Sequence, residues 1–69
     1  MKLSARNVLK GQVKKIDIGA VNAEVLVEIA PGVEVTSIIT KKSCESLGLA
    51  AGKDAYVVIK ASNVMIGTD

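Results

Sequence analysis

The segment NAEVLVEI at residues 22–29 decides the fold of this chain. Its apolar residues Ala23, Val25, Val27 and Ile29 fall on alternate positions, and polar residues fill most of the positions between them. Successive side chains of a β-strand point to opposite faces, so this alternation is typical of a strand with one buried face. The segment therefore predicts a half-buried strand, and its neighbours can be interpreted from it in both directions.

The segments on either side of this strand are also predicted strands. Residues 7–18 alternate in the same way at first, but the apolar positions shift near Lys14 and Lys15, which predicts a β-bulge or bend there. The Ala-Pro-Gly sequence at 30–32 is a turn signal. Residues 33–40, which follow it, are rich in β-branched side chains and predict a third strand.

The chain then changes from a strand pattern to a helix pattern. Thr40 is a suitable N-cap and Gly48 a suitable C-terminal stop, which predicts a helix of about two turns between them. Two more strands are predicted at 55–60 and 64–68. The fold class is therefore mainly β, a five-stranded OB-like barrel with one short helix between strands 3 and 4. Residues 1–69 are expected to form a single domain, without repeat or linker.

The size and composition predict an oligomer. The chain has 69 residues, 49% of them hydrophobic, and a mean hydropathy of +0.40. A domain of this size buries only about 60% of the surface of its unfolded chain, and such domains usually rely on disulfides, a metal or oligomerisation. The single cysteine, Cys44, and the lack of histidine argue against a disulfide and against a zinc site. Oligomerisation is then the expected source of additional burial.

Composition also limits the location and the class of partner. The sequence shows no secretory signal and no apolar run of the ~20 residues that a membrane helix needs. Together with the unpaired cysteine, this predicts a cytoplasmic protein. The net charge is +2, and Tyr56 is the only aromatic residue. Nucleic-acid binders carry clustered basic residues, and those for single strands also carry several stacking aromatics, so nucleic acid is not the expected partner.

Enzymatic activity is not expected either. Histidine, the commonest general base near neutral pH, is absent. Most of the acidic residues fall at polar strand positions or in turns, where solvated surface charge is the ordinary role. Cys44 lies on the presumed inner face of the helix and has no base to activate it, so it is interpreted as a core residue. Neither a Walker loop nor a dinucleotide fingerprint is present.

Three clusters of hydrogen-bond donors suit the binding of an oxyanion. They lie in SARN at 4–7, TKKS at 40–43 and KAS at 60–62, and they combine hydroxyls, cationic side chains and backbone N–H groups at strand or helix ends. A tetrahedral dianion needs several such donors, with positive charge to offset its desolvation. The candidate oxyanion-binding residues are Ser4, Ala5, Arg6, Thr40, Ser43, Lys60, Ala61 and Ser62.

Each cluster also has an ordinary structural explanation. Ser4 and Asn7 could cap the start of a strand, and Arg6 could pair with a surface carboxylate. Thr40 fits a simple N-cap, and Lys60 fits a solvated lysine. Periodicity does not bring the clusters together. Two other functions therefore stay open: an OB-like regulatory or nucleic-acid-binding module acting with a partner, and a structural oligomer that holds only adventitious sulfate.

A set of motifs in this order resembles a known family. SARN, LKGQV, GAVNAEV, TSIIT, S-x-x-LGL-x-x-GK and VIKASNVMI together span about Lys2 to Met65. They resemble the molbindins, which are small cytoplasmic molybdate-binding proteins, also called Mop or molybdenum-pterin-binding proteins, built from one TOBE domain. The resemblance implies an OB-like barrel assembled as a homohexamer, a trimer of strand-exchanged dimers.

The resemblance also implies a ligand and its sites. It implies storage or buffering of molybdate, and also of tungstate, with no organic cofactor and no metal held directly by the protein. The main site would join the SAR segment of one subunit to Thr40, Ser43 and the lysine segment of a neighbour. A second kind of anion site near a threefold axis would fall at Ala20, Val21 and Asn22. A pterin ligand fits less well, because it would need an aromatic or shaped apolar slot.

Overall fold

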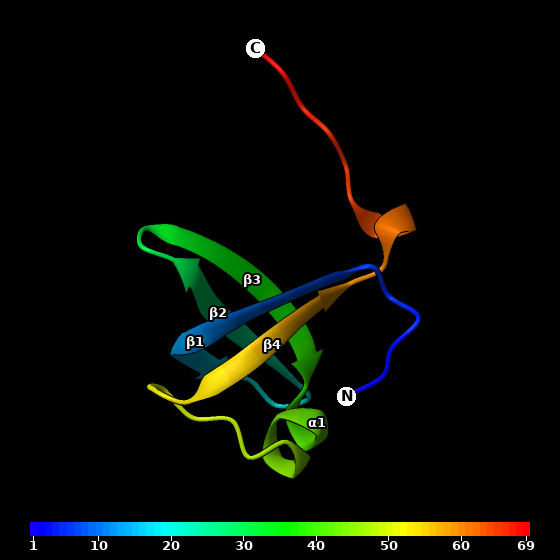
Figure 1. The fold of residues 1–69 in the computed structure, drawn as a ribbon. Coiled ribbons are helices and arrows are strands. Elements are labelled where there is room, and N and C mark those ends of the chain that lie inside the picture. Colours follow the sequence, from blue (N-terminus) through cyan, green and yellow to red (C-terminus); the bar gives the residue numbers. More distant parts are fainter.

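The computed structural model describes all 69 residues, and its centre is a strongly curled antiparallel sheet of four strands in the order β3-β2-β1-β4 (Figure 1). A short helix, α1, joins β3 to β4, and a 3₁₀ turn follows β4. The elements are β1 Asn7–Ile18, β2 Asn22–Ala30, β3 Val33–Thr40, α1 Lys41–Ser46, β4 Asp54–Ile59 and the 3₁₀ turn Ala61–Asn63. The first four predicted strands and the position of the helix are thereby confirmed.

β1 is the strand that shapes the sheet, because its two halves pair with different partners. Its first half, from Asn7 to Gln12, pairs with β4, and its second half pairs with β2. The register with β2 shifts between Val13 and Lys15, which confirms the predicted bulge. A bulge bends its strand and increases the local twist. Because of this bend, β1 can pair with β4 along its first half and with β2 along its second half.

The core is small and lies on the concave face of the sheet. Val13, Val25, Val27 and Val57 form its buried cluster, with α1 contributing Cys44 at one end. Only six of the 69 residues are buried. The alternation in β2 thus predicted the correct inward face, and the short chain leaves most of its aliphatic side chains exposed, as its composition suggested.

The predicted fifth strand is absent from this chain, whose sheet has four strands, so the prediction of a five-stranded barrel is wrong for the single chain. Residues 64–68 pair with no strand and extend away from the sheet (Figure 1). Met65 and Ile66 are 92% and 88% exposed. The 3₁₀ turn directs the chain outward, so these apolar residues do not reach an edge of the sheet. The structure is a half-barrel, open between β3 and β4.

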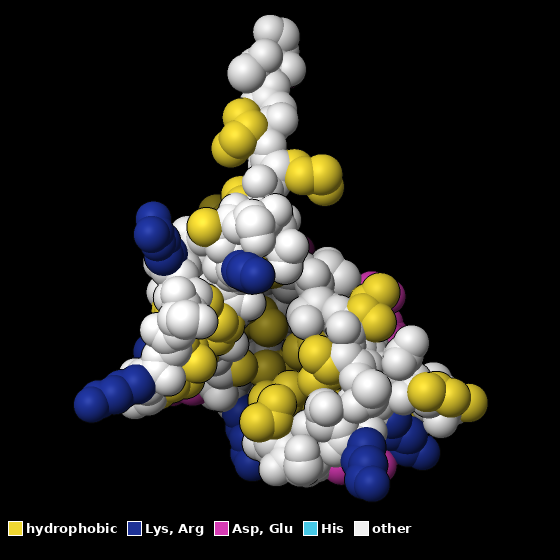
Figure 2. Space-filling view, turned by 90° about the vertical axis from the view of Figure 1, so that its right-hand side faces the viewer, with side chains coloured by type: hydrophobic (Ala, Val, Ile, Leu, Met, Phe, Trp, Pro, Cys, Tyr) yellow, Lys and Arg dark blue, Asp and Glu magenta, His cyan; other side chains and the backbone are white.

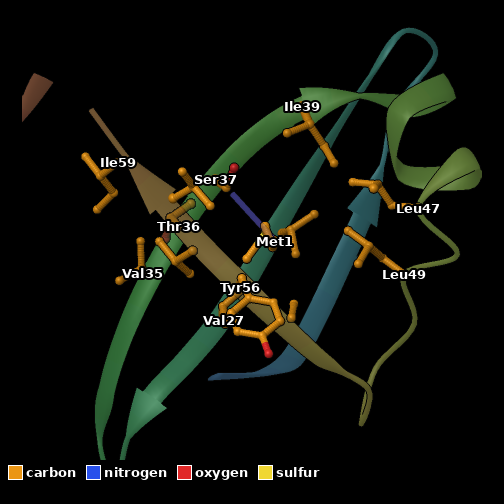
Figure 3. A pocket seen from close by; sticks show the side chains of 14 residues that line it. Met1, Val27, Val35, Thr36, Ser37, Ile39, Leu47, Leu49, Tyr56 and Ile59 are labelled. Carbon is orange, nitrogen blue, oxygen red and sulfur yellow. The ribbon is translucent and has the colours of Figure 1, made fainter. Parts of the chain in front are cut away.

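An apolar groove of about 690 Å³ occupies this opening. It is lined by 14 residues, 12 of them hydrophobic, mostly from β3, β4 and the segment after α1 (Figure 2). Met1 lies across the middle of it, between Ser37 of β3 and Tyr56 of β4 (Figure 3). Leu47, directly after α1, is 67% exposed although it lines this groove.

Candidate functional site: the donor clusters

The first cluster, Ser4 to Arg6, offers backbone donors that nothing in the chain uses. β1 begins only at Asn7, and no backbone or side-chain group of residues 1–6 forms a hydrogen bond. Ser4 and Arg6 are exposed, and Ala5 is half-buried. The N–H groups around Ala5 are therefore free within the chain, and the Ser4 hydroxyl and Arg6 guanidinium lie beside them in the sequence.

The third cluster, Lys60 to Ser62, follows the last residue of β4. Lys60 is the N-cap residue of the 3₁₀ turn, but no side chain caps this turn. The first N–H groups of a helical turn have no partner within the turn. All three residues are exposed. The segment thus presents backbone donors, a hydroxyl and an ammonium group at the end of the strand.

The pairing of β1 with β4 brings these two clusters to the same end of the sheet. Asn7 and Ile59 are the terminal pair of this ladder. Arg6 precedes one of them and Lys60 follows the other, so the two cationic residues extend from adjacent strand ends. The sequence could not show this proximity, because Lys60 is 54 residues away from Arg6 in the chain.

The second cluster lies at the other end of β1. Thr40 pairs with Asn22, beyond the turn that follows Ile18. No hydrogen bond or ion pair joins Thr40 or Ser43 to the other clusters. A single chain therefore assembles two of the three predicted clusters and leaves the third apart.

The groups of the second cluster are partly used within it. Thr40 Oγ1 accepts a hydrogen bond from the Ser43 N–H at 3.0 Å and donates one to Ser43 Oγ at 2.8 Å. The Lys41 N–H donates to the Val21 carbonyl at 2.7 Å. The N-cap role of Thr40 is thus confirmed. What remains for a ligand is chiefly the exposed Ser43 hydroxyl and the charges of Lys41 and Lys42.

The ion pairs of the chain leave the positive charges of the clusters uncompensated. Three lysines of β1 pair with carboxylates: Lys10 with Asp54 at 3.8 Å, Lys14 with Glu28 at 3.8 Å and Lys15 with Asp17 at 3.5 Å. Such exposed pairs contribute little stability, but they neutralise the positive charge of the three lysines on β1. Arg6, Lys41, Lys42 and Lys60 have no carboxylate partner.

The suggested second anion site has less favourable surroundings in the single chain. Ala20 and Val21, in the turn between β1 and β2, and Asn22, the first residue of β2, are exposed. A shallow depression beside this turn is lined partly by Asp17 and Glu24, which lie opposite each other on the two strands. Two carboxylates repel an anion, and no unpaired cation lines the depression.

Three further features bear on other kinds of function: groups that could hold a metal ion, the cysteine, and the length of the helices. No group of three or more His, Cys, Asp or Glu residues lies close enough to hold a metal ion. Cys44 is a free thiol, 3% exposed, which confirms its predicted place in the core. No helix has the length and apolar character needed to cross a membrane.

Asn7 belongs to the SARN segment and was predicted as a possible strand cap, but it is not among the candidate oxyanion-binding residues. Its side-chain Nδ2 donates to the Ile59 carbonyl across the β1–β4 ladder, at 3.2 Å. The sequence feature that could have pointed to a role for Asn7 near the site was its position directly after Ser4, Ala5 and Arg6. Its partner, however, is 52 residues away and becomes apparent only when the strands are paired.

Comparison with known sequences finds close relatives over the full length of the chain. Residues 3–66 match the TOBE domain family. The chain is 45% identical over all 69 residues to a probable molybdenum-pterin-binding protein of Haemophilus influenzae, and the match covers 100% of both chains. It is 52% identical over 66 residues to molybdenum-pterin-binding protein 3 of Clostridium pasteurianum, which covers 96% of this chain and 97% of the relative.

Solved structures share the same fold. MopII from Clostridium pasteurianum superposes with a TM-score of 0.90 at 46% identity, over 97% of this chain and 100% of MopII. A molybdate-bound crystal structure of the cytoplasmic molybdate-binding protein ModG gives a TM-score of 0.94 at 52% identity, over 100% of this chain and 49% of ModG. The fold described above is therefore one that known binding proteins use.

Proposed function

Because this chain belongs to the TOBE-domain family of small molybdenum-pterin-binding proteins, we propose that it binds molybdate, and also tungstate, as a non-enzymatic store in the cytoplasm. The ligand is the tetrahedral oxyanion, held by hydrogen bonds and charge. The protein supplies no direct metal ligand, and no organic cofactor takes part. Residues 1–69 act as one domain.

The observation that carries this proposal is the pairing of unsatisfied donors at one end of the β1–β4 ladder. Residues 4–6 and 60–62 provide backbone N–H groups, hydroxyls and two cations without carboxylate partners. Removing a dianion from water is costly unless donors and positive charge replace its hydration. An oxyanion would accept hydrogen bonds from these donors. Binding of this kind needs no general base such as histidine, which the chain lacks.

The complete site requires a second copy of the chain. Thr40 and Ser43 adjoin the other end of β1 and form no hydrogen bond or ion pair with the other clusters, so in this proposal a neighbouring subunit presents them. The full residue set of this shared site is Ser4, Ala5, Arg6, Thr40, Ser43, Lys60, Ala61 and Ser62.

The same assembly accounts for the open half-barrel. The groove between β3 and β4 lacks a closing strand, and residues 64–68 form an exposed apolar segment without a partner. Exchange of this segment between copies would bury both surfaces. The proposed assembly is a homohexamer, a trimer of such strand-exchanged dimers, with a second kind of anion site at Ala20 to Asn22. In the hexamer, cations of neighbouring subunits would have to offset Asp17 and Glu24 there.

Discrimination among anions follows from the donor set. A site made only of donors disfavours hydrogen phosphate, whose proton needs an acceptor. Sulfate carries no proton, so the size of the cavity must exclude it. Sulfate is therefore the informative control ligand.

Calorimetric titration of the purified protein with molybdate, and separately with sulfate, tests the proposal. Saturable molybdate binding with a much weaker response to sulfate is expected. Equal, weak responses to both anions would contradict it and favour a structural oligomer. Salt-dependent binding of a single-stranded oligonucleotide without molybdate binding would instead favour the regulatory or nucleic-acid-binding module.

A further inference from the structure

The side chain of Asn7 forms the last tie between β1 and β4. Asn7 and Ile59 are the terminal pair of the ladder, and the Asn7 Nδ2 donates to the Ile59 carbonyl at 3.2 Å. Asn7 is half-buried, whereas Arg6 and Val8 on either side of it are exposed. The amide is thus directed into the sheet end and not into solvent.

Beyond this pair, nothing else in the chain fixes the two donor segments relative to each other. Residues 1–6 form no hydrogen bond, and no side chain caps the turn after Lys60. Ladder ends fray readily, since they have few buried contacts and solvent-exposed hydrogen bonds. The relative position of Arg6 and Lys60 therefore depends on how firmly the terminal pair is held.

We propose that Asn7 is a positioning residue of the oxyanion site: its side-chain amide clamps the end of the β1–β4 ladder and so pre-organises the SAR and KAS segments. This inference rests on the proposed function, because it takes these two segments as parts of the site. Pre-organised donors lose less conformational entropy on binding, so the affinity rises without a new contact to the ligand.

The chain contains a matched control for this interaction. The Gln12 Nε2 donates to the Gly52 carbonyl, also at 3.2 Å. Gln12 lies on the same strand, at the opposite end of its pairing with β4. Its amide makes the same kind of bond, but no residue of the oxyanion clusters adjoins it. Removing either amide would lower the stability of the fold, but only removal of the Asn7 amide is expected to disturb the position of the oxyanion clusters.

The test compares Asn7→Leu with Gln12→Leu in the full chain. Leucine has approximately the shape of asparagine and removes its donor; at Gln12 it also removes the donor, with a side chain one atom shorter. Three quantities are measured: molybdate affinity by calorimetry, the thermal midpoint, and amide hydrogen exchange. For Asn7→Leu we expect about a tenfold loss of affinity, equivalent to ~1.4 kcal/mol, and faster exchange near Ile59. Gln12→Leu should bind molybdate as the wild type does, with a comparable thermal midpoint.

Two results would overturn the inference: wild-type affinity in Asn7→Leu, or an equal loss of affinity in both variants. If Asn7→Leu fails to form the native assembly, Asn7→Ala serves in its place, because it removes the donor without adding bulk or charge beside the anion site. The failure of the proposed function is a separate outcome, since the wild type itself would then not bind molybdate.

Discussion

At the scale of single residues, Arg6 is the group on which the proposed site depends most. It is exposed, has no carboxylate partner, and extends from the strand end beside Lys60. Its guanidinium can donate two parallel hydrogen bonds to an oxyanion and supplies charge that no neighbour neutralises. No hydrogen bond or ion pair within the chain would be lost if this side chain were shortened.

The variant Arg6→Ala should therefore abolish molybdate binding and leave a folded oligomer. Calorimetry measures the binding, and light scattering with chromatography measures the assembly. Lys10→Ala is the matched control, because it removes one positive charge from an exposed ion pair outside the site. An unchanged affinity in Arg6→Ala, or an equal loss in Lys10→Ala, would contradict the assignment of the site.

The N-cap Thr40 combines a structural role with a proposed binding role. Its Oγ1 accepts the Ser43 N–H, and loss of such a cap costs about 1 kcal/mol. Thr40→Ala should lower the free energy of unfolding by that amount and weaken molybdate binding. Thr40→Ser keeps the hydroxyl and should retain both properties. Chemical denaturation and calorimetry check the pair, and full binding by Thr40→Ala would limit Thr40 to its cap role.

At the scale of elements, the close approach of β1 and β2 depends on Gly11. A Cβ at this position would lie 2.5 Å from the carbonyl oxygen of Glu28 and 2.8 Å from a side-chain carbon of Val27. The first of these is a backbone atom, which cannot move without disturbing the strand pairing. At Gly11 the two strands therefore come too close together for any side chain to fit without a shift.

Gly11→Ala should destabilise the fold by about 1–3 kcal/mol, the usual cost of overpacking. Thermal or urea unfolding measures this change. Gly67→Ala is the control, because nothing lies within 4 Å of a Cβ added there, and its unfolding should not change appreciably. Equal stability of the two variants would mean that β1 and β2 are not tightly apposed at Gly11.

At the scale of the whole molecule, two apolar surfaces lack partners. One is the groove between β3 and β4, and the other is the segment after the 3₁₀ turn, where Ile66 is 88% exposed. Only six residues are buried in the isolated chain. A second copy could cover both surfaces at once, which links the assembly of the subunits to the completion of the site.

The double variant Val64→Asp, Ile66→Asp should dissociate the oligomer and weaken molybdate binding with it. These residues share one face of an extended segment, and burying two carboxylates in an apolar groove is costly. Sedimentation measures the assembly. The control Thr68→Asp adds a charge beyond the apolar part of the segment and should remain oligomeric. An intact oligomer in the double variant would exclude this segment from the interface.

The sequence by itself determined the elements. The alternation of β2, the phase shift at Lys14 and Lys15, the Thr40 cap and the Gly48 stop each depend on local geometry, which near neighbours in the chain set. The same is true of the residue types in the donor clusters. For this reason the first four strands, the bulge and the helix could be predicted without pairing information.

Only the tertiary structure decided which of these pieces meet. The β1–β4 register places Arg6 beside Lys60 and ties Asn7 to Ile59, whereas Thr40 falls at the opposite end of β1. The structure also leaves residues 64–68 unpaired, although their pattern is that of a strand. A strand-like sequence pattern indicates that a segment can pair. The pairing itself is a contact between distant parts of the chain, or between chains, so the local sequence does not identify the partner.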